Sequence, residues 1–225
     1  MGLAAPAIEA HDLYRFYHTG DDETLALRGV SLSIEQREVV AVMGPSGSGK
    51  STLVNCLAGL DEPDGGWVAV AGGRMTRRPQ AEQARLRVGH IGILLQSGNM
   101  LDHLTIGENL QAGMFVAGRK GSRRDIEAAL KAVGLRGRAG SFPEQLSGGE
   151  LARAGLALAL INNPAVILVD EPTAEVDAVN QAAVLEIIAT RARQGCAALM
   201  VTHSAAVASF ADRTLHLVDG RLADE

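Results

Sequence analysis

Several features are scarce or absent in this sequence of 225 residues. It has only two cysteines, Cys56 and Cys196, which are too few for a disulfide scaffold and lack the spacing of a metal site. We therefore expect two small buried side chains in a reducing compartment. The longest apolar stretch, around residues 155–161, is far shorter than the roughly 18 residues that a membrane span needs. The net charge of -5 argues against general nucleic-acid binding, which usually requires a basic surface.

Lysine and aromatic side chains are scarce as well. Three of the 21 basic residues are lysines, namely Lys50, Lys120 and Lys131. Aromatic residues make up 3% of the chain, and three of them stand together in the segment 14–17. Hydrophobic residues account for 47% and charged residues for 21%, which is usual for a soluble globular protein. The length allows one domain with a large core, or at most two small lobes.

Short apolar runs alternate with helical patterns over most of the chain. We expect strands over 7–15, 25–34, 38–43, 67–71, 90–95, 165–169, 197–202 and 214–218. We expect helices over 50–60, 79–88, 105–117, 123–133, 149–162, 178–193 and 205–210. Buried strands alternating with helices favour an α/β fold with a mostly parallel sheet covered on both faces. The helical stretch at about 97–162 interrupts this alternation.

A glycine-rich loop follows the strand predicted at 38–43. Residues 44–51 match the pattern G-x-x-x-x-G-K-[ST] between a buried strand and a helix, the context that this phosphate-binding motif requires. Lys50 can reach the β- and γ-phosphates, and the Ser51 hydroxyl can bind Mg²⁺. Thr52 stands where a dinucleotide-binding fingerprint would have its third glycine, so the sequence argues against a dinucleotide-binding site. The alternative is an incidental Gly/Ser turn.

A carboxylate pair follows the apolar run 166–169. Asp170 would lie at the carboxyl edge of the sheet beside the phosphate loop and could hold Mg²⁺ through its water shell. Glu171, one residue further, could polarise an attacking water. Without the phosphate loop, the same pair could equally be a solvated strand end.

Further motifs resemble those of the ATP-binding cassette (ABC) ATPases, in the family's order and over essentially the whole chain. The segment 146–150, Leu-Ser-Gly-Gly-Glu, is similar to the family's signature sequence. Tyr17 resembles the aromatic residue that stacks on adenine, and Gln96 resembles the glutamine of the Q-loop. Asp177 resembles the aspartate of the D-loop, and His203 resembles the switch histidine. Taken alone, Tyr17 could be a core aromatic, Gln96 a polar loop residue and His203 a structural histidine.

The resemblance implies a P-loop NTPase core with a mixed, mostly parallel sheet, an antiparallel β subdomain and a helical insert. The chain would be a single ABC ATPase domain over 1–225. Its core would comprise 1–96, including the N-terminal β subdomain, and 163–225. The helical subdomain would span 97–162.

The resemblance also implies ATP hydrolysis with Mg²⁺. The catalytic residues would be Glu171, His203 and Gln96, and the metal would be held by Ser51, Gln96 and Asp170. The nucleotide would contact a larger set: Tyr17, Gly44, Pro45, Ser46, Gly47, Ser48, Gly49, Lys50, Ser51, Thr52, Asp170, Ser147, Gly148, Gly149, Glu150 and Asp177.

The signature sequence opens a second helix with small residues at its start, which suits a phosphate. One chain would thus have two phosphate-binding helix starts for one nucleotide. The family resemblance explains this, because two cassettes dimerise head to tail and the signature of one completes the ATP site of the other. We therefore expect an ATP-dependent homodimer.

Some positions depart from the family's usual pattern. Glu150 replaces the commoner glutamine, and Leu151 and Leu158 replace polar residues of the signature helix. Val176 stands before the D-loop aspartate where leucine is usual, and Ser204 follows the switch histidine in place of aspartate. None of these departures removes a catalytic group.

The segments 57–61, 101–110 and 160–164 resemble the lipoprotein-releasing, macrolide-export and cell-division branch of the family. That resemblance implies an ATPase subunit that drives export or lipoprotein release through a separate permease with few spans. The alternative is a cell-division ATPase that regulates an extracytoplasmic enzyme without transport. A third alternative is a soluble cassette for DNA repair or translation. That class would require a coiled-coil insert or two fused cassettes, and we expect neither in 225 residues. We expect the chain at the cytoplasmic face of the membrane, with residues 96–109 against a cytoplasmic helix of the permease and no nucleic-acid partner.

Overall fold

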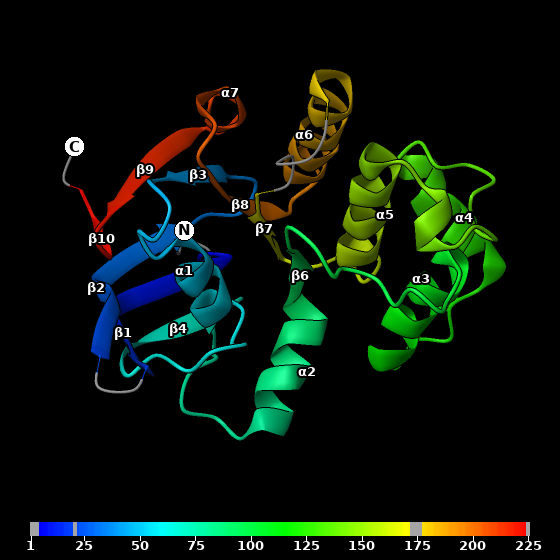
Figure 1. The fold of residues 1–225 in the computed structure, drawn as a ribbon. Coiled ribbons are helices and arrows are strands. Elements are labelled where there is room, and N and C mark those ends of the chain that lie inside the picture. Colours follow the sequence, from blue (N-terminus) through cyan, green and yellow to red (C-terminus); the bar gives the residue numbers. More distant parts are fainter. Residues whose placement is uncertain (1–4, 20–21, 172–176, 224–225) are drawn as a thin grey trace.

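Two β-sheets form the frame of the molecule (Figure 1). The structure, a computed structural model, describes residues 5–19, 22–171 and 177–223. The first sheet is antiparallel with the order β2-β1-β4-β5, comprising β1 (Ile8–Thr19), β2 (Asp22–Ile34), β4 (Gly65–Val70) and β5 (Gly73–Arg74). The second has the order β10-β9-β3-β8-β7-β6, comprising β3 (Val39–Met43), β6 (Ile91–Leu94), β7 (Val166–Asp170), β8 (Ala197–Thr202), β9 (Arg213–Val218) and β10 (Arg221–Leu222). Its described strands are parallel except for β10, which is antiparallel to β9.

Helix α1 (Lys50–Leu57) lies in the core between the two sheets. Leu53 and Val54 are fully buried and belong to one apolar cluster with side chains of both sheets. Cys56 lies in the same cluster, and its burial raises the pKa of its thiol to about 12. Because α1 is packed on both sides, its first residue and the glycine-rich loop before it are fixed at the end of β3.

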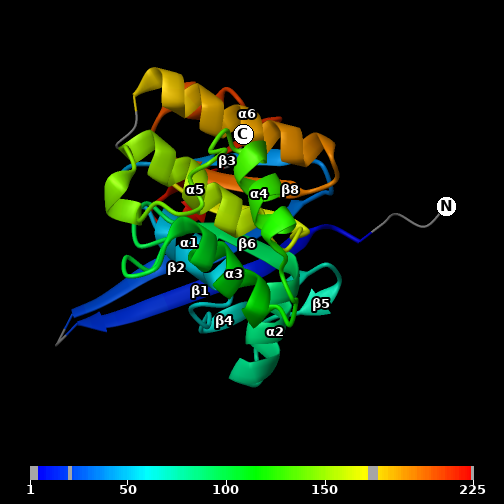
Figure 2. The ribbon, with the colours of Figure 1, turned by 90° about the vertical axis from the view of Figure 1, so that its right-hand side faces the viewer.

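The strands of the parallel sheet bury both faces. Along β7, Val166 and Leu168 pack into the cluster around α1, whereas Ile167 and Val169 pack against α6 (Ala178–Arg193). This two-sided burial explains why the strand is an unbroken apolar run in the sequence. Figure 2 shows α6 on one side of this sheet, and α1 with the antiparallel sheet on the other. The carboxyl ends of β3, β7 and β8 therefore meet at one edge, where ligands bind in open α/β sheets.

Three helices form a group of their own beside the sheets, at the right of Figure 1: α3 (Ile106–Val116), α4 (Arg123–Ala132) and α5 (Gly148–Leu160). A 3₁₀ turn, η1 (Pro143–Gln145), precedes α5. The group has its own apolar cluster, to which Leu110, Met114 and Leu130 contribute. Helix α5 also packs on β6 and α6 through Leu156 and Leu160, so it touches both parts of the molecule. The subdivision at residues 97 and 162 stays a prediction.

Most predicted elements are present, and they differ from the structure mainly at their ends. Strand β1 continues beyond residue 15 and β2 begins before residue 25, so the hairpin between them is longer than predicted. Helix α2 (Gln80–His90) runs to the start of β6, whereas α7 (Ala205–Ala208) stops two residues before the predicted end. The sequence patterns missed β5 and β10, because two residues are too few to show alternation. The turn predicted at residues 20–22 lies mostly outside the described ranges.

No helix within the described ranges is both long enough and apolar enough to cross a bilayer. The two cysteines are buried and unpaired, as predicted from their number and spacing. Burial raises the pKa of the Cys196 thiol to about 11, so neither thiol is readily ionised.

Candidate functional site

The predicted phosphate loop joins the end of β3 to the start of α1. Gly49 precedes α1 with a φ of 102°, a left-handed conformation that favours glycine. A Cβ at this position would lie 2.4 Å from the carbonyl oxygen of Ala26 in β2, so a larger residue would force the backbone apart. Within the described part of the chain, no side chain caps α1. The N–H groups of its first turn are therefore suited to an anionic ligand.

Lys50 is held in this loop by its own backbone. Its ammonium nitrogen, Nζ, donates hydrogen bonds of 2.8 Å to the carbonyl oxygens of Gly44 and Pro45, and the residue is only 8% exposed. A lysine ammonium has three donors, so a third is available for a phosphate oxygen. The Ser48 hydroxyl is also buried, and it has no hydrogen-bond partner among the described residues.

Asp170 ends β7 beside the first turn of α1. The Ser51 hydroxyl lies near the Asp170 carboxylate and counteracts part of the rise in its pKa, so strand and helix contribute neighbouring oxygen atoms. Burial is the main cause that raises the pKa of Asp170, and the nearby charge of Glu171 adds to it. The Ser51 hydroxyl and the charge of Lys50 act in the opposite direction without cancelling the rise.

Glu171 and His203 form a hydrogen-bonded pair at the ends of adjacent strands. Glu171 has a φ of 47° and donates its N–H to the carbonyl oxygen of Val201 in β8. Its carboxylate oxygen Oε1 lies 2.8 Å from Nδ1 of His203, and Thr202 donates its hydroxyl to Oε2 at 3.3 Å. The Glu171 side chain is 15% exposed and that of His203 is 69% exposed. The acid is thus held firmly while the histidine remains accessible.

Tyr17 is fixed by charged groups from two elements. Its hydroxyl donates a hydrogen bond of 2.6 Å to Asp61, which follows α1. Arg15, also on β1, pairs with both oxygens of the same carboxylate, and its guanidinium lies 4.6 Å from the centre of the Tyr17 ring. Burial and the hydrogen bond to Asp61 raise the pKa of Tyr17. One face of the ring is therefore covered by a cation.

A cavity of about 900 Å³ brings these residues together. The predicted site residues that line it are Tyr17, Ser46, Gly47, Gly49, Lys50, Ser51, Thr52, Gln96, Asp170, Glu171 and His203. Sequence motifs did not indicate the rest of the lining, which comes mainly from β2, including Arg28, and from Asp219 and Gly220 in the turn after β9. That turn is tied to the loop because Gly220 donates its N–H to the carbonyl oxygen of Ser48.

The predicted signature residues lie outside this cavity, at the start of α5. Ser147 precedes the helix, and its hydroxyl accepts the N–H of Glu150. A Cβ at Gly149 would lie 2.3 Å from the side-chain carbon Cγ of Asn180 in α6, so glycine allows α5 and α6 to approach each other there. Gly148 lines a smaller hollow of about 180 Å³, which Gln96 and Glu171 also line.

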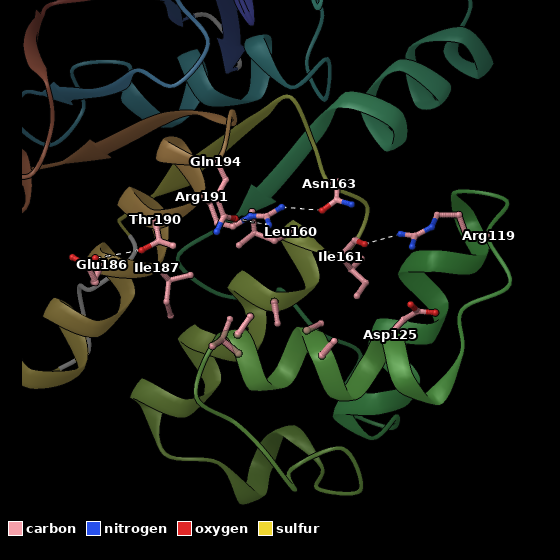
Figure 3. Close-up of a pocket in the computed structure, with 15 residues that line it drawn as sticks. Arg119, Asp125, Leu160, Ile161, Asn163, Glu186, Ile187, Thr190, Arg191 and Gln194 are labelled. Atoms are coloured by element: carbon pink, nitrogen blue, oxygen red, sulfur yellow. Dashed lines mark hydrogen bonds between the residues drawn. The ribbon is translucent and has the colours of Figure 1, made fainter.

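A third hollow, of about 500 Å³, lies between α4, α5 and α6 (Figure 3). Its floor is apolar, with Leu160 and Ile161 from the end of α5 and Ile187 from α6. Arg119 and Arg191 stand near its rim, and both are engaged with neighbouring oxygen atoms of the chain. None of the predicted site residues lines this hollow, so the chemistry concentrates in the cavity beside the phosphate loop.

Comparison with known proteins gives the family of the chain. Residues 27–174 match the model of a family described as ABC transporter. The chain is 39% identical over 221 residues to the macrolide export ATP-binding/permease protein MacB of Chlorobium luteolum. It belongs to the ABC transporter family. It is also 40% identical over 200 residues to the lipoprotein-releasing system ATP-binding protein LolD of Bacteroides fragilis.

The cassette matches these relatives over different shares of their lengths. The alignment covers 98% of this chain but only 33% of MacB, so the chain spans about a third of that relative. It covers 87% of this chain and 92% of LolD. Among solved structures, a dimer of the ATP-binding cassette MJ0796 in a post-hydrolysis state with ADP and phosphate has a TM-score of 0.90 and 32% identity. That match covers 96% of this chain and 97% of MJ0796, and it agrees with the predicted fold class.

The segment predicted to be the D-loop lies only partly within the described ranges. Residues 172–176, which include the departure at Val176, lie outside the described ranges. Asp177 precedes α6, and its carboxylate accepts the N–H groups of Val179 and Asn180 and the side-chain amide of Asn180. These hydrogen bonds lower the pKa of Asp177. Asn180 also contacts Arg153 of the signature helix, which links the start of α6 to α5.

Two asparagines to which the sequence motifs give no role shape the loop after Gln96. The side chain of Asn99 forms hydrogen bonds of 2.7 Å with both the N–H and the carbonyl of Leu95. Asn109 is buried, and its side chain bonds the backbone of Leu101 and of the residues just before α3. In the sequence, the role of Asn109 could have been suspected only because it is a polar residue at an apolar position of the predicted helix.

Asp61→Asn is expected to weaken nucleotide binding roughly three- to tenfold, because the Tyr17 ring loses the charged group that holds it in place. Aromatic stacking on a base contributes on the order of 1–3 kcal/mol, and a less firmly held ring would lose part of this energy. Titration with a fluorescent ATP analogue would measure the change. Glu62→Gln is the matched control, since Glu62 binds Arg77 and Gln83 instead. An unchanged affinity in Asp61→Asn, with a loss in Tyr17→Ala, would assign no role to the anchor.

Proposed function

We propose that this cassette binds and hydrolyses ATP as the motor subunit of a membrane transport complex. The observation that carries the proposal is the convergence of the phosphate loop, Asp170, Glu171 and His203 on one cavity. At about 900 Å³ the cavity has the size of sites for nucleotide-sized ligands. The uncapped start of α1 and the ammonium group of Lys50 supply positive charge where phosphates would lie.

The oxygen atoms around Ser51 suit Mg²⁺, which prefers hard oxygen ligands and keeps several waters. The Ser51 hydroxyl and the Asp170 carboxylate would hold the ion, with the Gln96 side chain in the same cavity. The described residues contain no cluster of three or more His, Cys, Asp or Glu side chains suited to a metal, so the ion would depend on the phosphates. When bound, it neutralises phosphate charge.

Glu171 would act as the base that orients and deprotonates the attacking water. Its carboxylate is mostly buried, and its position is fixed by Thr202 and His203. The exposed His203 ring can turn toward the γ-phosphate once a nucleotide is present. Lys50 and the N-terminus of α1 would stabilise the charge that moves onto the β-phosphate as the bond breaks.

Mg²⁺ strengthens ATP binding only while Asp170 is ionised. As the pH falls, this effect of Mg²⁺ should disappear at a higher pH than it would if Asp170 had the pKa of an ordinary aspartate. Burial raises the pKa of Asp170, so its carboxylate is protonated earlier as the pH falls, and the neutral acid is a poor Mg²⁺ ligand. ATP affinity measured over a pH series, with and without Mg²⁺, would show this. Asp170→Asn should remove the difference between the two series; Mg²⁺ dependence that persists down to the pH of an unperturbed aspartate would contradict the assignment.

A second copy of the chain would complete the site. The signature at the start of α5 lies outside the cavity of its own chain, although its small residues suit a phosphate. A head-to-tail dimer would bring the Ser147–Gly149 segment of each copy to the nucleotide of the other. The dimeric state of MJ0796, a close match in fold, supports this arrangement.

The transport role is inferred from the relatives. MacB is named as a macrolide export protein with both ATP-binding and permease parts, and LolD as the ATP-binding protein of a lipoprotein-releasing system. We infer a permease with few spans as the partner, which would place the cassette at the cytoplasmic face of the membrane. The hollow beside Gln96 and Asn99, with the 51% exposed Leu101 nearby, supports docking of the permease at residues 96–109.

Site-specific crosslinking to a co-expressed permease tests the proposal. The two native cysteines are buried, so Leu101→Cys would introduce an accessible thiol. We expect this variant to crosslink to the permease, while Phe210→Cys, at a similarly exposed position beyond α7, does not. A crosslinking survey without permease contacts in 96–109 would refute the docking site. Absence of Mg²⁺-dependent ATPase activity in the complex would refute the motor function.

A further inference from the structure

An ion pair stands at the start of the signature helix. The Arg138 guanidinium, in the loop before η1, donates from Nη2 to Glu150 Oε1 at 2.8 Å. The other oxygen of this carboxylate accepts the backbone N–H of Ser147 at 3.0 Å. The Glu150 side chain is 21% exposed and that of Arg138 is 45% exposed. Both side chains are therefore partly open to solvent at the start of the signature helix.

The carboxylate of Glu150 has two opposite effects at this position. It closes a capping box with Ser147 and stabilises the positive end of α5. It also places a negative charge beside the helix start that would bind a phosphate in the proposed dimer. The hydrogen bonds from Ser147 and Arg138 lower the pKa of Glu150, so it stays charged at neutral pH.

The capping box leaves part of the helix start for a ligand. It takes up the N–H groups of Ser147 and Glu150 and makes no use of those of Gly148 and Gly149, the first two residues of α5. A phosphate that reaches these two glycines would lie close to the Glu150 carboxylate. Without a counter-charge, the two anions would repel each other over a distance at which solvent screens poorly.

We propose that Arg138 is a positioning residue of the composite ATP site: it neutralises the charge of Glu150. The signature can then accept the γ-phosphate of the nucleotide that a second copy of this chain holds. The inference rests on the proposed ATP-dependent dimer. Arg138 acts in trans, on the nucleotide of the other copy, and it has no contact with the cavity of its own chain. Glutamine at position 150 would keep the capping geometry without the charge and would make Arg138 dispensable.

The test is a double-mutant cycle in the hydrolysis-deficient Glu171→Gln protein, with light scattering during ATP and Mg²⁺ titration as readout. We expect Arg138→Ala to weaken ATP-dependent dimerisation roughly tenfold, because each dimer contains two such partly exposed pairs and each contributes a few-fold. Glu150→Gln should dimerise at least as well as the parent, and the double variant should match Glu150→Gln. Arg136→Ala, which removes the same charge two residues earlier, should behave as the parent.

Binding of a fluorescent ATP analogue to the monomer separates this inference from the proposed function. Arg138→Ala should bind the analogue as tightly as the parent, since its own phosphate loop is intact. If Arg138→Ala dimerises like the parent, or if the double variant is as weak as Arg138→Ala alone, the neutralising role is wrong. If the parent itself stays monomeric with ATP, both the proposed dimer and the role of Arg138 in it are wrong.

Discussion

Glu171→Gln is expected to slow ATP hydrolysis by about 10²- to 10⁴-fold and to accumulate an ATP-bound dimer. The amide keeps the size of the side chain but cannot accept the proton of the attacking water. ATP binding should persist, because the phosphate loop and Asp170 are unchanged. Phosphate release measures the loss of hydrolysis, and size-exclusion chromatography with ATP and Mg²⁺ measures the dimer.

The control for this substitution lies on α6. Glu186 forms an exposed ion pair with Arg193, so Glu186→Gln makes the same chemical change far from the cavity and should retain activity. Hydrolysis at the parental rate in Glu171→Gln would assign the base to another group. A variant that stays monomeric with ATP and Mg²⁺ would contradict the head-to-tail dimer.

Lys50→Ala should reduce ATP affinity on the order of 10²-fold. The substitution removes the charged phosphate donor of the loop, and a hydrogen bond to a charged group contributes roughly 3 kcal/mol at most. It also frees the carbonyl oxygens of Gly44 and Pro45, which Lys50 holds at 2.8 Å, so the loop itself should loosen. Equilibrium binding of a fluorescent ATP analogue measures the affinity, and thermal unfolding without nucleotide reports the loosening.

The chain has only two lysines besides Lys50, and both serve as controls for this substitution. Lys120 and Lys131 are both exposed, so alanine at either position should leave affinity unchanged. Lys50→Arg is the informative variant, because a guanidinium is larger and planar whereas the cradle fits a compact ammonium. We expect it to bind ATP nearly as poorly as Lys50→Ala. Parental affinity in Lys50→Arg would mean that charge alone, and not the fit, matters in this loop.

The structure explains two departures from the usual family pattern. Ser204 precedes α7, and its hydroxyl accepts the N–H of Val207. Serine and aspartate are both good helix caps, so serine can replace the usual aspartate after His203. Leu158 packs against the apolar cluster of α3, α4 and α5, which accounts for an apolar residue there. Nothing in the structure explains the half-exposed Leu151.

The sequence predicted the parts of the nucleotide site that depend on local geometry. A strand, six loop residues with glycine at the tight positions, and a helix beginning at Lys50 form one contiguous unit, whose shape is dictated by backbone sterics and hydrogen bonding. The signature helix is equally local, since Ser147 and Glu150 form its capping box. The roles of these residues toward ATP remain predictions.

Other features depend on contacts between distant segments. The anchoring of Tyr17 by Asp61, the pairing of Glu171 with His203 and the pairing of Arg138 with Glu150 join residues from different elements. No sequence pattern encodes such pairs, because they arise where separate strands and helices pack. The same holds for the shift in the pKa of Asp170, which burial causes.

The alternation of apolar runs with helical patterns, and the glycine-rich loop after a buried strand, determined by themselves an α/β fold with a phosphate loop, because both are local properties of the chain. The cassette family followed from the resemblance of the motifs and their order. Only the tertiary structure decided that the cavity is lined by the phosphate loop, Asp170, Glu171 and His203 while the signature lies outside it. The reason is physical: parallel strands bring their carboxyl ends to one edge, whereas α5 begins in a separate group of helices.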